Sequence, residues 1–180
     1  MSDWSNKKPT GALILDDGNI FKGYGCGYEG SSIGEVCFNT AMTGYQEIMT
    51  DPSYASQIIT FTFPHIGNVG TNLEDVENEN GPKIKGAIFN SPVTSPSNWR
   101  SKKSLNSWLN ENKIIALYGV DTRSITTHIR EKGFMNGIII NDQNGFNNND
   151  RFKDELSKWE GIVGQDLAKI VSTKRIYNWS

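Results

Sequence analysis

Two cysteines and two histidines are the side chains best suited to nucleophilic or acid–base chemistry in this chain. Cys26 lies between Gly25 and Gly27, where a thiol could occupy a tight turn. A nucleophile elbow, however, has its glycines two residues on either side of the nucleophile, and Tyr24 and Tyr28 occupy those positions. The pattern therefore favours a small apolar residue in a glycine-rich hairpin. Because the sequence shows no secretion signal, we expect both cysteines to be free thiols.

The remaining candidates for chemistry also have simpler structural explanations. Cys37 lies between Val36 and Phe38 and is expected in the core. His65 follows a strand and precedes a loop, where a histidine often fixes a turn through hydrogen bonds. His128 falls in the middle of a predicted helix, with a surface or half-buried role. These four residues lack metal-ligand spacing, and no glycine loop is followed by Lys-Ser or Lys-Thr. The spacing of residues therefore predicts no catalytic set and no metal site.

Composition excludes several classes of function. The 180 residues carry a net charge of −2, and 36% are hydrophobic. A nearly neutral chain has no long-range field to attract nucleic acid or an acidic membrane. No apolar run approaches the roughly 20 residues of a membrane helix. Residues 1–10 form a polar tail rather than a signal peptide. We expect a globular cytoplasmic protein with no nucleic-acid or membrane partner.

Hydrophobic periodicity predicts an α/β fold in which strands come first and helices alternate with strands later. A hairpin is expected where Asp17-Gly18 separates two apolar runs. Asp121 is placed to cap a helix that Gly133 ends. Strands are expected at residues 11–15, 36–38, 57–63, 85–90, 114–118 and 137–140, and helices at 44–49, 101–112, 122–132 and 152–159.

Three segments are expected to be irregular. Residues 67–82 contain three glycines and four acidic residues, which predicts an exposed loop whose charges are solvated. Residues 141–150 are rich in asparagine and also predict a loop. Residues 164–180 show no clean period and predict a linker. Trp179 has no evident packing partner there, which suggests a partner surface or a further domain.

Two long motifs carry a specific resemblance. Residues 34–54 read GEVCFNTAMTGYQEIMTDPSY, and residues 57–72 read QIITFTFPHIGNVGTN. Shorter matches follow at 119–123 (GVDTR), 129–133 (IREKG) and 164–168 (GQDLA). Together they closely resemble the small, glutaminase subunit of carbamoyl-phosphate synthetase (also written synthase), over residues 11 to 180.

The resemblance implies a fold and a domain organisation. Residues 11–160 would form the N-terminal domain of the small subunit, which has a swivelling β/β/α fold. Residues 161–180 would be a linker toward a class I glutamine amidotransferase domain that carries a Cys–His–Glu triad. The sequence contains no Gly-x-Cys-x-Gly motif before Ser180. We therefore expect no catalytic residue in this chain, and no glutaminase activity from the chain alone.

The resemblance also implies partners. In the family, the small subunit hydrolyses L-glutamine and passes ammonia through a tunnel to the large subunit. The large subunit combines ammonia with bicarbonate and uses two ATP, with Mg²⁺, to make carbamoyl phosphate for arginine and pyrimidine biosynthesis. This chain is expected to hold no cofactor of its own.

One residue carries a site role by resemblance. Ser53, within the Asp51-Pro52-Ser53-Tyr54 segment, matches the family serine that reaches the glutamine pocket from the N-terminal domain. A hydroxyl can donate to the substrate while accepting from a neighbour, and Pro52 would make its loop rigid. From the residues alone, a serine after Asp-Pro is an ordinary turn residue. The resemblance instead implies that Ser53 binds glutamine.

Three functional hypotheses follow. The chain could be the scaffolding half of an amidotransferase subunit that completes the glutamine pocket and contacts the large subunit. It could be an independent hydrolase that uses Cys26 or Cys37 with His65. It could also be a free-standing interaction domain that regulates a complete synthetase. The first is the hypothesis that the resemblance supports.

Overall fold

The computed structural model describes residues 8–78, 80–144, 146 and 150–172. The tail at residues 1–7, the end of the expected linker at 173–180, and Trp179 with it lie outside the described residues. No described helix is long and apolar enough to cross a bilayer.

The order of elements confirms the expected α/β character. The strands are β1 (Gly11–Leu15), β2 (Ile20–Gly27), β3 (Gly30–Asn39), β4 (Gln57–Phe61), β5 (Gly86–Phe89), β6 (Ile115–Tyr118) and β7 (Met135–Asn141). The helices are α1 (Tyr45–Thr50), the short 3-10 helix η2 (Pro52–Tyr54), α2 (Leu105–Glu111), α3 (Thr122–Lys132), α4 (Asp150–Ser157) and α5 (Leu167–Val171).

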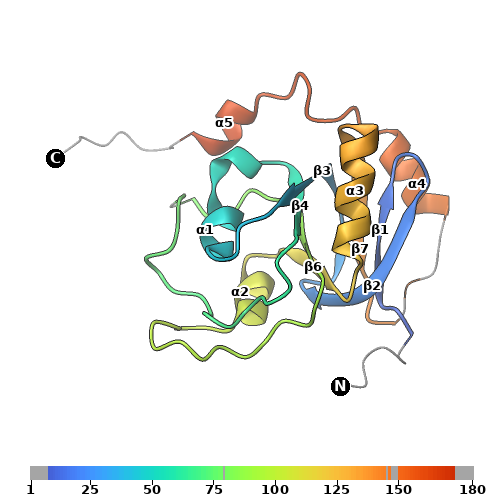
Figure 1. Ribbon diagram of the computed structural model, residues 1–180. Coiled ribbons are helices and arrows are strands. Elements are labelled where there is room, and N and C mark those ends of the chain that lie inside the picture. Colours follow the sequence, from blue (N-terminus) through green and yellow to red (C-terminus); the bar gives the residue numbers. More distant parts are fainter. Residues whose placement is uncertain (1–7, 79, 145, 147–149, 173–180) are drawn as a thin grey trace.

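The described strands close into a barrel in the order β1-β2-β6-β5-β4-β3-β7. Strands β3, β4, β5 and β6 are parallel neighbours. The pairs of β1 with β2 and β7, of β2 with β6, and of β3 with β7 are antiparallel. Parallel neighbours need crossover connections, and α1 with η2 lies in the β3–β4 crossover while α2 lies in the β5–β6 crossover. Figure 1 shows α1 and α2 on one side of the barrel and α4 on the other.

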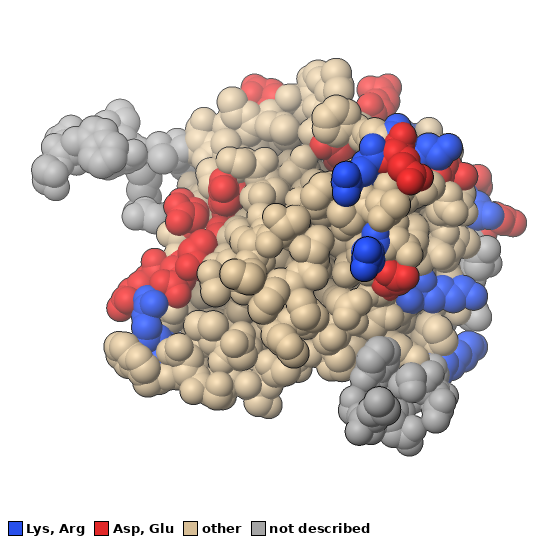
Figure 2. Space-filling view, in the orientation of Figure 1, with Lys and Arg blue, Asp and Glu red and all other residues tan. Residues whose placement is uncertain are grey.

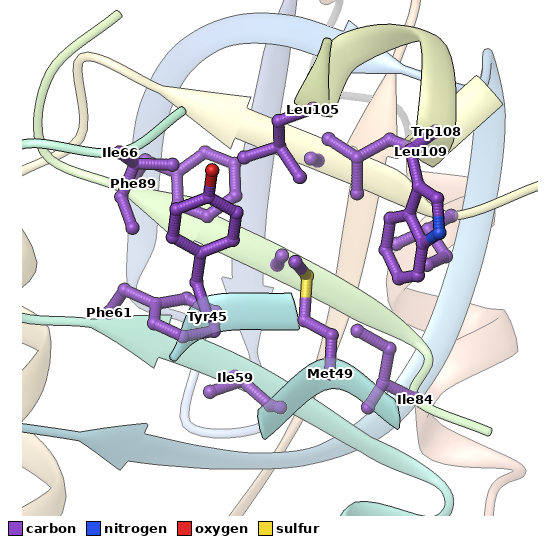
Figure 3. Close-up of a cluster of buried hydrophobic side chains, with 13 residues drawn as sticks. Tyr45, Met49, Ile59, Phe61, Ile66, Ile84, Phe89, Leu105, Trp108 and Leu109 are labelled. Carbon is purple, nitrogen blue, oxygen red and sulfur yellow. The ribbon is translucent and has the colours of Figure 1, made fainter. Parts of the chain in front are cut away.

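Alternate residues of the strands face different apolar clusters, as the period of two requires. The barrel strands and α3 share one cluster, which includes Leu13, Ile58, Ile88, Leu117, Ile125 and Ile139. Strands β1 and β7 share another with α4, which includes Ile14, Ile138, Ile140 and Leu156. The third lies between α1, α2 and strands β4 to β6, and its labelled members in Figure 3 include Tyr45, Met49, Phe61, Phe89 and Trp108. The helices α1 to α4 are therefore held against the barrel by the apolar side chains on one face of each helix.

The residues that were predicted to form a turn or to begin and end a helix do so in the structure. In the β1–β2 turn, Gly18 has a φ of 89°, a conformation that glycine adopts without strain. The carboxylate of Asp121 accepts a hydrogen bond from the backbone N–H of Ser124 at 2.9 Å and so caps α3. Gly133 ends α3 with a φ of 94°.

Some boundaries differ from the expectation. The strand predicted at 57–63 ends at Phe61, and the helix predicted at 101–112 begins only at Leu105. The Ser104 hydroxyl accepts from the N–H of Ser107 at 3.2 Å and starts α2 there. The expected linker contains the short helix α5, which Asp166 caps.

The expectation of a solvated loop at residues 67–82 was wrong in one respect. Arg100 lies 3.1 Å from Glu74 and 2.7 Å from Asp75, so two of the four acids are ion-paired. Thr71 and Asn72 are buried, and the Asn72 amide donates to Asp75 at 2.7 Å. The loop is therefore attached to the body of the protein. Sequence periodicity could not show this attachment, because Arg100, which pairs with the loop, lies about 25 residues further along the chain.

Met49 provides a test of the packing between α1 and the barrel. Its side chain is fully buried. We expect Met49→Ala to lower the free energy of unfolding by about 2–5 kcal/mol, because it removes apolar contacts and leaves a cavity. Chemical denaturation measures this change. The control is Met42→Ala, which alters a side chain that is 71% exposed and should change stability by less than about 0.5 kcal/mol. Equal effects would contradict the packing described.

The cap of α3 predicts a pH dependence. Hydrogen bonds from the Ser124 hydroxyl and N–H lower the pKa of Asp121 from 3.8. A lowered folded-state pKa stabilises the protein above pH 3.8, and the stabilisation is lost as the pH falls through the folded-state pKa. Asp121→Asn keeps a capping oxygen without a titrating group. The stability difference between wild type and Asp121→Asn should therefore shrink between neutral pH and pH values below about 4. A constant difference in thermal or urea unfolding would contradict this.

Candidate functional site

Ser53 occupies the short helix η2 and is exposed. Its backbone N–H donates to the Asp51 carboxylate at 2.7 Å, and Pro52 takes the first helical position, where its missing N–H is not needed. The N–H of Tyr54 donates to the Asp51 carbonyl at 3.1 Å. The sequence thus folds into a tight turn that leaves the Ser53 hydroxyl at the surface. The predicted presentation of Ser53 on a restrained turn is confirmed, while its proposed ligand stays a prediction.

The end of β3 is attached to this turn. The Asn39 amide nitrogen donates to the Tyr54 hydroxyl at 2.9 Å, and its amide oxygen accepts from the N–H of Ala41 at 2.8 Å. Residues 40–43 then run exposed from β3 toward α1, and Met42 is 71% exposed. Two surface segments, at residues 40–43 and 52–54, are therefore joined through one side chain.

Helix α1 attaches the long 62–85 connection to the same region. The Tyr45 hydroxyl donates to the Gly70 carbonyl at 2.6 Å. The Gln46 side chain forms two hydrogen bonds with the Asn72 backbone, donating to the carbonyl at 2.7 Å and accepting from the N–H at 2.9 Å. Burial raises the pKa of Tyr45 to about 12, so its phenol stays protonated as a donor. The part of this connection at Gly70 and Asn72 is thus bonded to α1.

Neither thiol is placed for catalysis. Cys26 on β2 and Cys37 on β3 both pack against the apolar cluster beneath α1 and α2. Burial raises the pKa of each thiol to about 12, and for Cys37 the charge of Glu35 adds to the effect. Among the described residues, no hydrogen bond joins either thiol to a histidine. A protonated, half-buried thiol without a base is a poor nucleophile, so the geometry opposes a cysteine hydrolase.

The histidines have different surroundings. His65 is exposed, and its ring makes an edge contact with Phe63 at a centroid distance of 5.9 Å. The Nε2 atom of His128 on α3 lies 2.6 Å from the Asp17 carboxylate and also contacts the Asn19 amide. These two contacts join the helix to the β1–β2 turn. The expectation of a surface or half-buried position for His128 is confirmed, because its side chain is partly buried. No described group of three or more His, Cys, Asp or Glu side chains could hold a metal ion.

Two shallow cavities lie away from Ser53. One, of about 330 Å³, is lined by α3 residues that include Asp121, Arg123 and His128. The other, of about 470 Å³, is lined by Cys26, Asn106, Tyr118 and Gln143 among others. Neither contains Ser53 or His65, and the thiol in the second is protonated. Ser53 thus lies outside both of these cavities.

Comparison with known proteins bears on the family of this chain. The family described as "Carbamoyl-phosphate synthase small chain, CPSase domain" matches residues 13–139. The carbamoyl phosphate synthase small chain of Bartonella quintana (strain Toulouse) is 54% identical over 180 residues, which cover 98% of this chain and 45% of the relative. That of Bradyrhizobium diazoefficiens is 50% identical over 179 residues, with the same coverage. The chain belongs to the carbamoyl-phosphate synthase small chain family.

The chain spans less than half the length of these relatives and corresponds to their N-terminal part. The family assignment suggested by the motifs is thereby confirmed. Among solved structures, an aminopeptidase from Aneurinibacillus sp. strain AM-1 is 10% identical, with a TM-score of 0.41 over 76% of this chain and 31% of its own. That likeness is too low to bear on fold or function.

The family match singled out Ser53, whose ligand stays a prediction. Sequence reasoning missed the side chains that hold the Ser53 turn and the 62–85 connection. Asn39, Tyr45, Gln46 and Tyr54 all lie inside the first family motif, where only the match itself marked them. Their roles depend on partners in other elements, so spacing could not reveal them.

The thiols provide a test of this site description. With a pKa near 12, each cysteine should be alkylated by iodoacetamide at pH 8 at least about a hundredfold more slowly in the folded protein than in urea. The variants Cys26→Ser and Cys37→Ser assign the rate to each thiol. A thiol that reacts faster in the folded state would instead support the cysteine hydrolase.

Proposed function

We propose that this chain is the non-catalytic N-terminal domain of the glutamine-hydrolysing small subunit of carbamoyl-phosphate synthase. In this proposal it supports the supply of ammonia from glutamine for carbamoyl phosphate synthesis. The observation that carries the proposal is the exposed Ser53 hydroxyl, held on a restrained turn in a chain whose thiols are protonated. In this proposal, a second surface completes the pocket to which Ser53 contributes.

The surface near this turn suits a partner domain. Figure 2 shows acidic side chains along the left margin, on the side where the loops of the 62–82 region lie in Figure 1. Between this margin and the charged side chains over α3 lies a broad strip without charged residues. The exposed segment Thr40-Ala41-Met42-Thr43 is also uncharged. Depletion of charge is typical of the centre of protein–protein interfaces.

The remaining parts of the proposal follow from the family resemblance. Residues 11–160 form a domain of the swivelling β/β/α type, and residues 161–180 lead toward a glutaminase domain that supplies the Cys–His–Glu triad. The large subunit is the partner that uses ATP and Mg²⁺, and the assembly acts in the cytoplasm. The chain by itself then hydrolyses no glutamine.

Ser53→Ala tests the proposal in an assembled synthase whose small subunit carries this chain as its N-terminal part. We expect the KM for glutamine to rise about five- to tenfold, because a substrate hydrogen bond is lost. Synthesis from added ammonia should be unchanged, since it does not use the glutamine pocket.

The matched control is Ser107→Ala, which removes another exposed hydroxyl, on α2. It should leave both activities unchanged. An unchanged KM for glutamine in Ser53→Ala would remove Ser53 from the site and would favour an interaction domain without a substrate contact.

A further inference from the structure

We propose that Asn39 is a positioning residue for glutamine binding, which acts by holding the Ser53 turn through the Tyr54 hydroxyl. This inference rests on the proposed function and names a residue on which that function depends. Asn39 contacts no substrate in this proposal. Its effect is exerted through the position of Ser53.

The backbone at Asn39 is fixed independently of its side chain. Asn39 is the last residue of β3 and lies opposite Phe61 in the parallel pairing with β4. Its carbonyl accepts from the Thr62 N–H at 3.1 Å and from the Thr62 hydroxyl at 3.3 Å. The side chain therefore starts from a rigid point on the barrel, which is what a positioning group requires.

The direction of the amide follows from its partners. The N–H of Ala41 can only donate, so the group it meets at 2.8 Å must be the amide oxygen of Asn39. The amide nitrogen is then directed at the Tyr54 hydroxyl, 2.9 Å away, which accepts. One side chain thus restrains both the exposed 40–43 segment and the 52–54 turn.

The Ser53 turn is held at both ends. At its start, the Asp51 carboxylate accepts from the Ser53 N–H. At its end, the Tyr54 ring packs against the apolar cluster under α1, and the Tyr54 hydroxyl is bonded to Asn39. Asp51 shapes the turn itself, whereas the Asn39–Tyr54 hydrogen bond ties the turn to the end of β3. A small displacement of a group that orients the substrate can lower the reaction rate considerably.

Single and double variants in the assembled synthase test the link. Asn39→Ala and Tyr54→Phe should each raise the KM for glutamine about three- to tenfold, with ammonia-dependent synthesis unchanged. The double variant should be no worse than Asn39→Ala alone, because both changes remove the same bond. KM effects that multiply would overturn the proposal, as would equal losses in both activities, which indicate reduced folding.

Asn39→Asp provides the conservative rescue. A carboxylate still accepts from the Ala41 N–H and can accept from the Tyr54 hydroxyl, which then donates. The KM for glutamine should stay within about twofold of wild type, and adding Tyr54→Phe should raise it again. Asn39→Asp behaving like Asn39→Ala would contradict the proposed bridge. The control is Asn112→Ala at the C-terminal cap of α2, which removes a 2.9 Å amide-to-carbonyl bond to Trp108 and should leave the KM unchanged.

The Ser53→Ala background separates this inference from the proposed function. If Asn39 acts through the Ser53 hydroxyl, adding Asn39→Ala to Ser53→Ala should change the KM less than about twofold further. If Ser53→Ala raises the KM while Asn39→Ala alone does not, the positioning role fails and the proposed function stands. If Ser53→Ala has no effect, the proposed function itself fails.

Discussion

The constraint on which the site depends is the closure of the barrel through β3. Residues 30–36 of this strand pair antiparallel with β7, and residues 35–39 pair parallel with β4. One strand therefore joins the antiparallel part of the sheet to its parallel part. Because its register is fixed on both sides, the position of Asn39 at its end is fixed as well. The exposed segments that follow begin from that point.

Several residues of the family motifs hold one segment of the chain against another rather than taking part in a reaction. The described residues of the 62–85 connection between β4 and β5, all but residue 79, form no helix, although a parallel crossover usually contains one. Tyr45 and Gln46 replace the packing of a helix with buried hydrogen bonds to the backbone of Gly70 and Asn72. Buried polar groups are costly unless paired, so these bonds also specify where the loop lies.

The potentially reactive side chains of this chain differ in their exposure. Both thiols are withdrawn into or against the core, while a serine is left exposed on a turn that is bonded at each end. In the proposed function, such a surface forms one half of the glutamine pocket. The chain also covers 45% of the length of its relatives.

The sequence by itself determined what depends on neighbours along the chain: the hairpin at Asp17-Gly18, the cap at Asp121, the apolar strands and the family motifs. Its match to the family also proposed Ser53 as a glutamine-binding residue, which stays a prediction. Barrel closure, the pairing of Arg100 with Asp75 and the bridge from Asn39 to Tyr54 were decided only by the tertiary structure. The physical reason is that turns and periodicity are local, whereas register and hydrogen-bond partners arise only when distant segments are brought together.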